Sequence, residues 1–193
     1  MEASPDSDAT AMRRLAAGDD LALNELMHRW QERVAAFLHR MTGNHAAARD
    51  LAQETFLRLY QSRTRYKPSA SFSSYLFRIA SNLARNHHRW QARHPSEPIQ
   101  ALQDCGREPA SEDDSPDEAL AHEEITRAVQ LAVQSLPADL REALVLFTYH
   151  DLGHHDIAAV AGCTPKAAET RLYRARQILK EKLQGLASGS ATM

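Results

Sequence analysis

The chain has 193 residues, of which 43% are hydrophobic, so it can bury a core as one domain or as two small ones. Only 7 glycines occur and no segment alternates like a strand, which predicts an all-α fold. No apolar run approaches the roughly 20 residues of a membrane span, and the acidic, polar N-terminus excludes a signal peptide. We therefore expect a cytoplasmic protein with no membrane insertion.

The first part of the chain predicts three helices after a flexible segment at 1–18. Apolar residues recur in steps of three and four over 23–41, which places them on one buried stripe. A second helix is expected over 45–62 and a third from about 71 to 91. The third helix has a broad polar, cationic face that carries Arg78, Asn82, Arg85, Asn86 and Arg89.

The net charge of −2 by itself argues against a nucleic-acid-binding protein, but the charges are segregated along the chain. Residues 55–96 contain no Asp or Glu and eight Lys or Arg, whereas residues 97–124 contain ten acids and one base. A solvated helix face usually mixes both signs. The acid-free window therefore predicts a cationic functional surface.

The acidic, proline-containing segment 95–118 predicts a flexible linker between two small helical domains. The domains would cover 19–94 and 119–185, and a flexible tail would follow at 186–193. The acid cluster is either a solubilising spacer or a mask for a cationic surface, and the sequence leaves both open.

The second domain ends in the pattern of a helix-turn-helix. In the stretch GHHDIAAVAGCTPKAAETRLYRAR, a short helix leads to Gly162, which suits a sharp turn. Thr164 is a good N-cap and Pro165 a good first residue for the longer helix that follows. Apolar residues line one side of that helix and basic residues line the others. This arrangement places a recognition helix in the major groove of DNA.

The same stretch raises the alternative of a metal site. His154 and His155 point about 100° apart on a helix, so one ion cannot easily bind both. Cys105 and Cys163 form neither a disulfide framework nor a CxxC pair, and Cys163 suits a small packing residue. No metal and no other cofactor are expected.

Three stretches, in this order, resemble the small two-domain RNA polymerase sigma factors of the extracytoplasmic-function (ECF) group of the sigma-70 family. RDLAQETFLRLYQ resembles region 2.2, SFSSYLFRIASNLARNHHR resembles regions 2.3 and 2.4, and the segment 136–183 resembles region 4. The resemblance implies a dissociable initiation subunit, not an enzyme, that binds core RNA polymerase, recognises promoter DNA and helps to melt it. Such relatives are usually held inactive by an anti-sigma factor, which is often membrane-bound.

The resemblance also implies which residues bind. Core RNA polymerase would contact Asp50, Gln53, Glu54, Phe56 and Leu57. The −10 element would contact Lys67, Arg78, Asn82, Arg85, Asn86 and Arg89, with a flipped-out base in the loop 67–73. The −35 element would contact Lys166, Glu169, Thr170, Arg171, Tyr173 and Arg174. Glu169 is an acid where the family often has a base, so the −35 sequence of relatives does not transfer directly.

The residues by themselves leave two other functions open. A stand-alone helix-turn-helix regulator would explain the second domain. It would not explain the acid-free helix of the first domain, next to a helix that carries Asp50, Gln53 and Glu54. A metal-binding sensor would use the histidines and Cys163. A hydrolase has no support, because no Ser/His/Asp order, glycine-rich phosphate loop or HExxH motif occurs.

Overall fold

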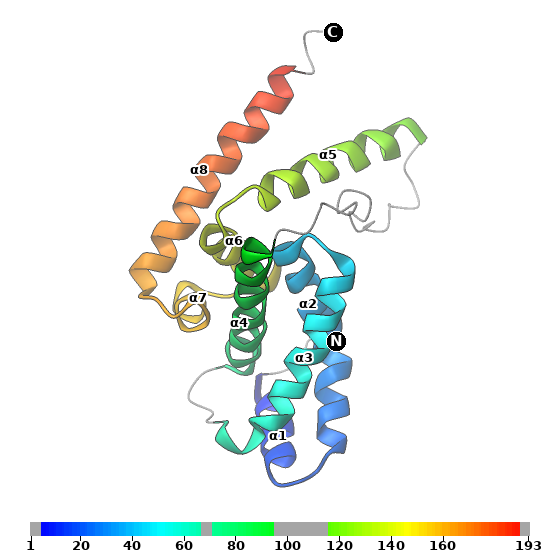
Figure 1. The fold of residues 1–193 in the computed structure, drawn as a ribbon, viewed down its shortest axis with the longest axis vertical. Coiled ribbons are helices and arrows are strands. Elements are labelled where there is room, and N and C mark those ends of the chain that lie inside the picture. Colours follow the sequence, from blue (N-terminus) through cyan, green and yellow to red (C-terminus); the bar gives the residue numbers. More distant parts are fainter. Residues whose placement is uncertain (1–4, 67–70, 95–115, 190–193) are drawn as a thin grey trace.

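The computed structural model describes the backbone of residues 5–66, 71–94 and 116–189, and the side chains of 7–66, 71–94 and 125–184. Within these ranges the structure is helical and has no strand, which confirms the all-α prediction (Figure 1). We call α1–α4 the N-terminal half and α5–α8 the C-terminal half. The elements are α1 (Pro5–Ala16), α2 (Leu21–Thr42), α3 (His45–Gln61), the 3-10 turn η1 (Arg63–Arg65), α4 (Phe72–Arg93), α5 (Pro116–Gln134), α6 (Ala138–His150), α7 (His154–Ala161) and α8 (Pro165–Gly189).

Helix α2 is the central helix of the N-terminal half. It buries most of the stripe predicted over 23–41, although Leu23 and Met27 are only half-buried. The buried residues of the helix are Ala22, Leu26, Trp30, Val34, Phe37, Leu38 and Met41. The helix ends at Gly43, whose φ of 70° lies in the left-handed region that favours glycine. Asn44 then caps α3, because its side chain accepts a hydrogen bond from the amide of Ala47 at 2.9 Å.

The prediction of a flexible segment at 1–18 is wrong for the residues of α1. Met12 and Leu15 are fully buried in the core. The indole of Trp30 donates a hydrogen bond to the buried carboxylate of Asp8 at 3.1 Å. Helix α1 is short and carries few apolar residues, so its tertiary contacts stabilise it rather than a periodic pattern that the sequence displays.

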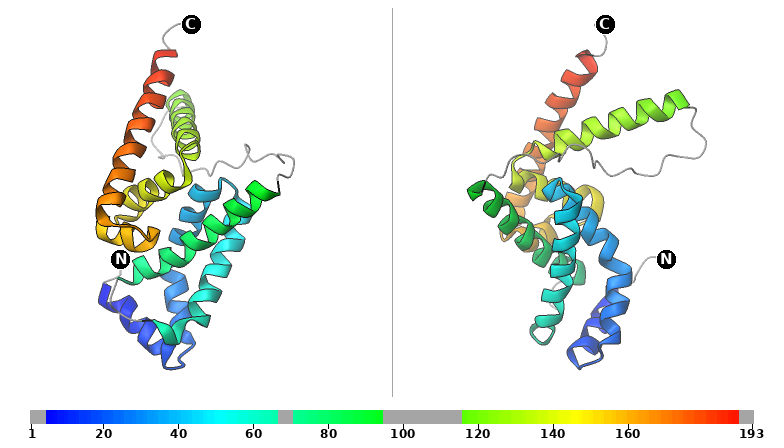
Figure 2. Two further views of the ribbon diagram at one scale, coloured as in Figure 1. Left: turned by 60° about the vertical axis from the view of Figure 1, so that its left-hand side comes forward. Right: turned by 45° about the vertical axis from the view of Figure 1, so that its right-hand side comes forward.

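The two halves pack against each other, and their buried residues form one continuous core. Helix α4 contacts α2 and α3 on one side and α7 on the other, and α6 contacts α2 (Figures 1 and 2). The ring of His150, from α6, packs against Phe77 of α4 and Phe37 of α2, with centroids at 4.4 and 5.8 Å. Of the linker expected at 95–118, residues 95–115 lie outside the described residues, as does Lys67, whereas 116–118 form the start of α5. The flexible tail expected at 186–193 is also partly helical, because α8 continues to Gly189.

The C-terminal half contains the predicted helix-turn-helix. Helix α7 ends at Gly162, with a φ of 66°, and the hydroxyl of Thr164 accepts from the amide of Ala167 at 3.2 Å. Ala168, Leu172 and Ala175 bury the inner side of α8. Helices α5 and α8 extend towards the same end of the molecule (Figure 1). Among the described helices, none combines the length and the apolar character that a membrane span requires.

Candidate DNA and polymerase interfaces

The outer face of α4 is cationic, and asparagine side chains of the same helix hold two of its arginines in place. Arg78, Asn82, Asn86 and Arg89 are exposed, and Arg85 is half-buried. The guanidinium of Arg85 donates to the amide oxygen of Asn82 at 2.8 Å, and that of Arg89 donates to Asn86 at 2.6 Å. These pairs hold two guanidinium groups along a helix that carries no acid, which is a suitable arrangement for binding phosphates.

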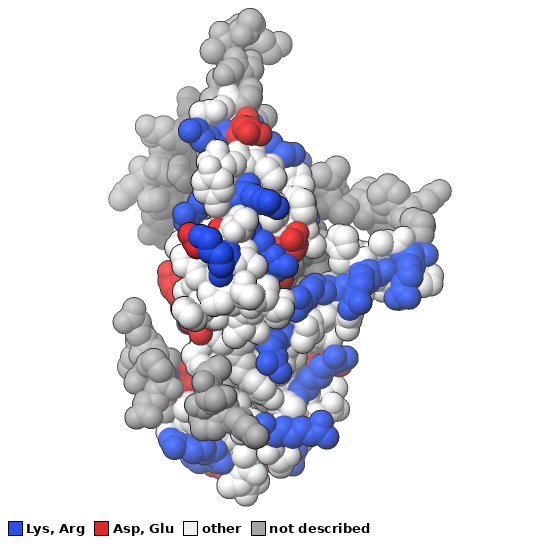
Figure 3. Space-filling view, turned by 90° about the vertical axis from the view of Figure 1, so that its left-hand side faces the viewer, with Lys and Arg blue, Asp and Glu red and all other residues white. Residues whose placement is uncertain are grey.

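A groove of about 690 Å³ runs between this face and the C-terminal half. Its lining consists of Arg78, Asn82, Arg85, His88 and Arg89 from α4, together with Ala138 and residues 159–162. Viewed from this side, Lys and Arg side chains outnumber acidic ones across the surface of the molecule (Figure 3). The acid-free window of the sequence therefore contributes to a face on which basic side chains outnumber acidic ones.

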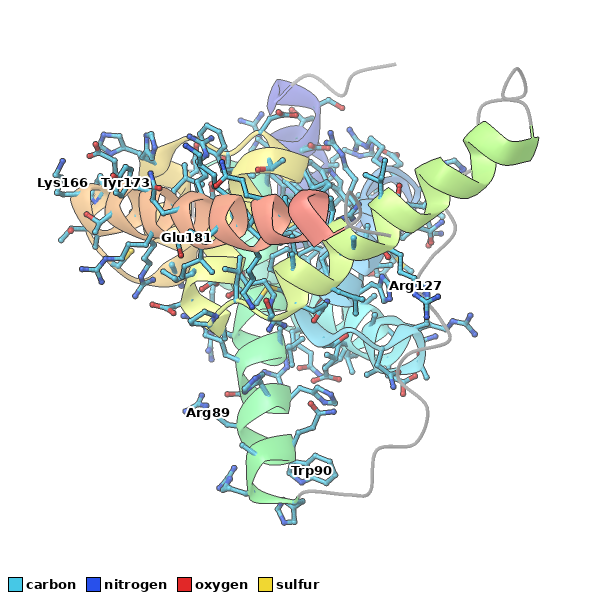
Figure 4. All side chains as sticks on the ribbon, turned by 90° about the horizontal axis from the view of Figure 1, so that it is seen from above. Arg89, Trp90, Arg127, Lys166, Tyr173 and Glu181 are labelled. Carbon is cyan, nitrogen blue, oxygen red and sulfur yellow. The ribbon has the colours of Figure 1, made fainter. Side chains whose placement is uncertain are left out.

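The N-terminal part of α8 forms the second cationic surface. Lys166, Glu169, Thr170 and Tyr173 are exposed, and Lys166 and Tyr173 lie near one end of the helix, away from Glu181 (Figure 4). The ammonium of Lys166 lies 2.9 Å from the carboxylate of Glu169. That hydrogen bond lowers the pKa of Glu169, so the acid is charged and already partly neutralised by its neighbour.

Arg171 and Arg174 differ in their surroundings. Arg174 is exposed, whereas Arg171 is half-buried and its guanidinium lies 3.5 Å from the carboxylate of Asp139, on α6. Both residues line a second hollow of about 380 Å³ between α6 and α8. Arg174 is thus available to a ligand, while Arg171 also holds α8 against α6.

The expected polymerase-binding residues lie on α3, and most of them reach the surface. Asp50 and Gln53 are exposed, and Leu57 is an exposed apolar side chain at 49%. Glu54 is half-buried and pairs with Arg58 at 2.7 Å. Phe56 is different: it is only 4% exposed and belongs to the core. Its expected role as a direct contact is therefore wrong, because its ring faces inward.

The histidines of the helix-turn-helix and its cysteine do not converge. His155 is exposed, the ring of His154 lies 5.8 Å from that of Phe147, and Cys163 is half-buried against the core. No group of three or more His, Cys, Asp or Glu side chains suited to a metal ion occurs among the described residues. A sensor that uses these histidines and Cys163 has no geometric support there.

Three polar side chains of the C-terminal half have contacts that sequence reasoning missed. Arg141 and Glu142 are 7% and 1% exposed, and Asp156 is half-buried. All three reach residues of the N-terminal half. The one signal in the sequence is the pair of adjacent charges at 141–142 between the apolar residues Leu140 and Ala143, because charged residues are rarely buried unless paired.

Taken together, these elements define an all-helical protein with a C-terminal helix-turn-helix and a second cationic helix in its N-terminal half. The sequence matches the family described as Sigma-70 region 2 over residues 26–94, and that described as Sigma-70, region 4 over residues 126–179. It is 30% identical over 185 residues to the RNA polymerase sigma-H factor of Pseudomonas aeruginosa, covering 94% of this chain and 96% of that protein. It is also 30% identical over 184 residues to the ECF RNA polymerase sigma-E factor of Escherichia coli, covering 93% and 96%.

The chain therefore belongs to the sigma-70 family of RNA polymerase sigma factors, in the ECF group. Two solved structures share its fold. CnrH, in complex with the cytosolic domain of CnrY, superposes with a TM-score of 0.69 at 23% identity, covering 92% of this chain and 97% of that one. The sigma factor RpoE of Bartonella quintana, in complex with the anti-sigma factor NepR, gives 0.66 at 23% identity, covering 83% and 96%.

Proposed function

We propose that the chain, as a dissociable initiation subunit, binds core RNA polymerase through α3 and promoter DNA through α4 and α8. The observation that carries this proposal is the presence, in one chain, of two separate cationic helices that expose their charged sides. A stand-alone helix-turn-helix regulator requires only α8. The acid-free α4, with an acidic and amide-bearing face on the neighbouring α3, matches a subunit that contacts both DNA and a protein.

We assign the −10 element to the outer face of α4 and the −35 element to α8. Arg78, Arg85 and Arg89 suit phosphate contacts, which hold register without reading sequence. The amides of Asn82 and Asn86 suit the edges of unpaired bases. This assignment follows the boundaries 19–94 and 119–185 for the two DNA-binding units.

On α8, the −35 contacts would come from Lys166, Glu169, Thr170, Tyr173 and Arg174. Glu169 accepts a hydrogen bond, so it suits the amino group of a cytosine once Lys166 turns to a phosphate. Arg171 would contact a phosphate at the edge of the site and not a base, because its guanidinium also pairs with Asp139.

We further propose that an anti-sigma factor controls this protein, that it acts in the cytoplasm and that it has no enzymatic activity of its own. Support comes from the two structural relatives, which were solved with CnrY and with the anti-sigma factor NepR. The partner would cover the same cationic and α3 surfaces that initiation requires.

In vitro transcription with core RNA polymerase on a random promoter library tests the proposal. Wild-type chain should direct promoter-specific transcripts, and the enriched sequences would define both elements. The double variant Asp50→Ala with Glu54→Ala should lose core binding and transcription together. Asp20→Ala with Glu32→Ala removes two carboxylates from exposed sites on the N-terminal half and serves as the matched control.

The outcomes separate the role from the residue assignment. If the wild-type chain with core enzyme gives no specific transcripts, the proposed function is wrong. If the Asp50 and Glu54 variant transcribes like wild type, the function stands and the assignment of α3 is wrong.

A further inference from the structure

Three arginines at one end of the N-terminal half have no acidic partner in the described part of the chain. They are Arg13 of α1 and Arg63 and Arg65 of η1, and we call them the η1 patch. No described carboxylate lies within 4.0 Å of their guanidinium nitrogens. Arg14, the next residue after Arg13, is different, because it pairs with Asp19 at 2.7 Å and with Glu25 at 2.9 Å. The η1 patch therefore keeps charges that are available to a ligand.

The η1 patch is fixed to the start of α4. Tyr66, directly after η1, packs on the ring of Tyr75 of α4, with centroids 5.1 Å apart. The hydroxyl of Ser62, directly before η1, lies 2.8 Å from the hydroxyl of Tyr75. The guanidinium of Arg63 lies 4.0 Å from the ring centroid of Tyr60 and donates to the backbone carbonyl of that residue at 2.9 Å. These contacts hold η1 and its arginines in one orientation relative to α4.

Arg13 joins the patch from the neighbouring helix, since α1 contacts both η1 and α4. Burial raises the pKa of the Tyr66 phenol, and the positive charge of Arg13 is near enough to oppose that rise. Asp8, an acid of the same helix, is only 3% exposed and pairs with Arg29 at 2.8 Å. That carboxylate is therefore occupied inside the protein, whereas Arg13 and Arg65 are exposed.

The character of this surface fits a polyanion better than a protein partner. Arg63 and Arg65 belong to the same window, 55–96, that contains no Asp or Glu and that includes all of α4. Among the described residues, neither α1 nor η1 carries an exposed large apolar side chain, and such side chains form the core of most protein interfaces. The patch therefore continues the cationic surface of α4 and lacks the usual anchors for a protein.

The η1 patch lies beyond one end of the cationic face of α4. Helix α1 and η1 lie near Phe72, where α4 begins, whereas the chain leaves the other end of α4, after Arg93, on its way to the C-terminal half (Figures 1 and 2). Under the proposed function, the C-terminal half binds the −35 element, which is upstream of the −10 element. The upstream side of the −10 element therefore faces the end of α4 near Arg93, and its downstream side faces η1.

We propose that Arg13, Arg63 and Arg65 bind the phosphates of the unpaired promoter strand directly downstream of the −10 element. This inference rests on the proposed function of α4. Guanidinium groups without an acidic partner suit phosphates, because they donate parallel hydrogen bonds and release condensed counterions from the DNA. Such contacts do not depend on base identity, so they strengthen binding to melted DNA without adding a sequence preference.

Two forked promoter probes separate the η1 patch from the face of α4. In the short probe the unpaired strand ends with the −10 element, and in the long probe the same strand continues downstream. The double variant Arg13→Ala with Arg65→Ala changes two exposed side chains. In complex with core RNA polymerase and at ~0.1 M salt, it should bind the long probe about 25-fold more weakly than wild type, at about 5-fold per phosphate contact. Its affinity for the short probe should equal that of wild type.

The salt dependence of binding counts the contacts. Each phosphate contact on a single strand adds about 0.7 to the slope of log affinity against log salt concentration, so the double variant should reduce the slope for the long probe by about 1.4. Arg14→Ala is the matched control, because it removes the neighbouring arginine, which already pairs with Asp19 and Glu25, and it should leave slope and affinity unchanged. Arg13→Lys with Arg65→Lys keeps both charges and should retain most of the slope.

A cleavage reagent attached to the protein determines the direction of the strand. An iron chelate that generates hydroxyl radicals is coupled to Thr64→Cys, in η1, or to Gln91→Cys, near the end of α4, both exposed sites. Cys105 and Cys163 are replaced by serine, so that each protein carries one cysteine. The chelate at position 64 should cleave the unpaired strand downstream of the −10 element, and the chelate at position 91 should cleave upstream of it.

The outcomes separate this surface from the proposed function. Equal losses on the short and long probes, or cleavage from Thr64→Cys upstream of the −10 element, would overturn the downstream contact. Wild-type affinity of the double variant for the long probe would overturn it as well. Weaker binding of core enzyme with unchanged probe binding would identify a protein partner and also contradict the proposal. If the wild-type holoenzyme bound neither probe, the proposed function would be wrong instead.

Discussion

Acidification is expected to open the two halves, because His150 is buried between them in its neutral form. Its ring packs on Phe37 and Phe77 of the N-terminal half, and neither ring nitrogen has a hydrogen-bond partner among the described residues. Burial, together with the nearby guanidinium groups of Arg40 and Arg33, lowers the pKa of His150 to about 3. When the halves separate, the ring meets water and its pKa returns towards the ordinary value near 6.5.

The pH dependence of the closed form follows from the difference between the pKa values of His150 in the closed and open forms. A group whose pKa is depressed in the closed form stabilises that form fully above its ordinary pKa and loses the contribution as the pH falls. The loss begins near pH 6.5 and continues towards pH 3, at about 1.4 kcal/mol per pH unit, so the closed form should lose about 2 kcal/mol at pH 5. Dyes on the exposed sites Asn24→Cys of α2 and Gln177→Cys of α8 report the distance between the halves, and the open fraction should increase roughly 30-fold relative to pH 7.5.

The control variants isolate His150 from the other histidines. His150→Phe keeps an aromatic ring between Phe37 and Phe77 and removes the titration, so its dye distance should be constant from pH 7.5 to 5. His155→Gln removes an exposed histidine of the same half and should retain the wild-type response. If His150→Phe opens with the same midpoint as wild type, the reasoning from His150 is refuted.

Four further predictions concern single positions. Arg174→Ala should cost about 1–3 kcal/mol in promoter binding if it contacts a base, whereas Arg127→Ala, on α5, should cost nothing; equal affinities in a mobility-shift titration would place Arg174 off the interface. Glu169→Gln should change the ranking of −35 sequences in a competition assay, and an unchanged ranking would mean that the acid faces solvent. Arg141→Met should destabilise the protein by about 2–4 kcal/mol in urea unfolding, because it strands the buried carbonyls of Met41, at the end of α2, and of Leu136; a loss below 0.5 kcal/mol would contradict that account. Gly43→Ala should destabilise it by about 1–2 kcal/mol, since φ is 70° there and an added Cβ would lie 3.1 Å from the amide oxygen of Gln134; unchanged unfolding would show that the turn relaxes.

Much of the fold could be predicted because its signals are local. The stripe along α2 repeats over six turns, and the turn at Gly162 with its cap at Thr164 is specified by a few adjacent residues. The cationic face of α4 follows from the absence of acids in one window. These features depend on spacing along the chain, which the sequence displays directly.

The contact between the halves could not be predicted in that way, because it joins residues far apart in the sequence. Ser81 looks like an ordinary small polar residue until it meets Glu142, and His150 looks like a surface histidine at the end of α6. The polymerase contact expected of Phe56 is wrong for a related reason: neighbours on one helix point to different sides, and a motif match does not say which side is covered. Two adjacent charged residues in the middle of a helix, as at 141–142, flanked by apolar ones, are the one local sign that a partner lies elsewhere.

The polar contacts between α7 and α4 favour a reversible association of the two halves. An interface held by apolar burial alone would leave a large hydrophobic surface when the halves part, and such surfaces promote association. Here α7 meets α4 through serines, a carboxylate and carbonyl groups, which water can satisfy equally well. The interface also has an apolar part, because the buried residues of both halves form one continuous core, and protonation of His150 would oppose that part. At the polar part of the interface, a charged ligand such as DNA competes with α7, because Arg85 can exchange the carbonyl of Ala161 for a phosphate.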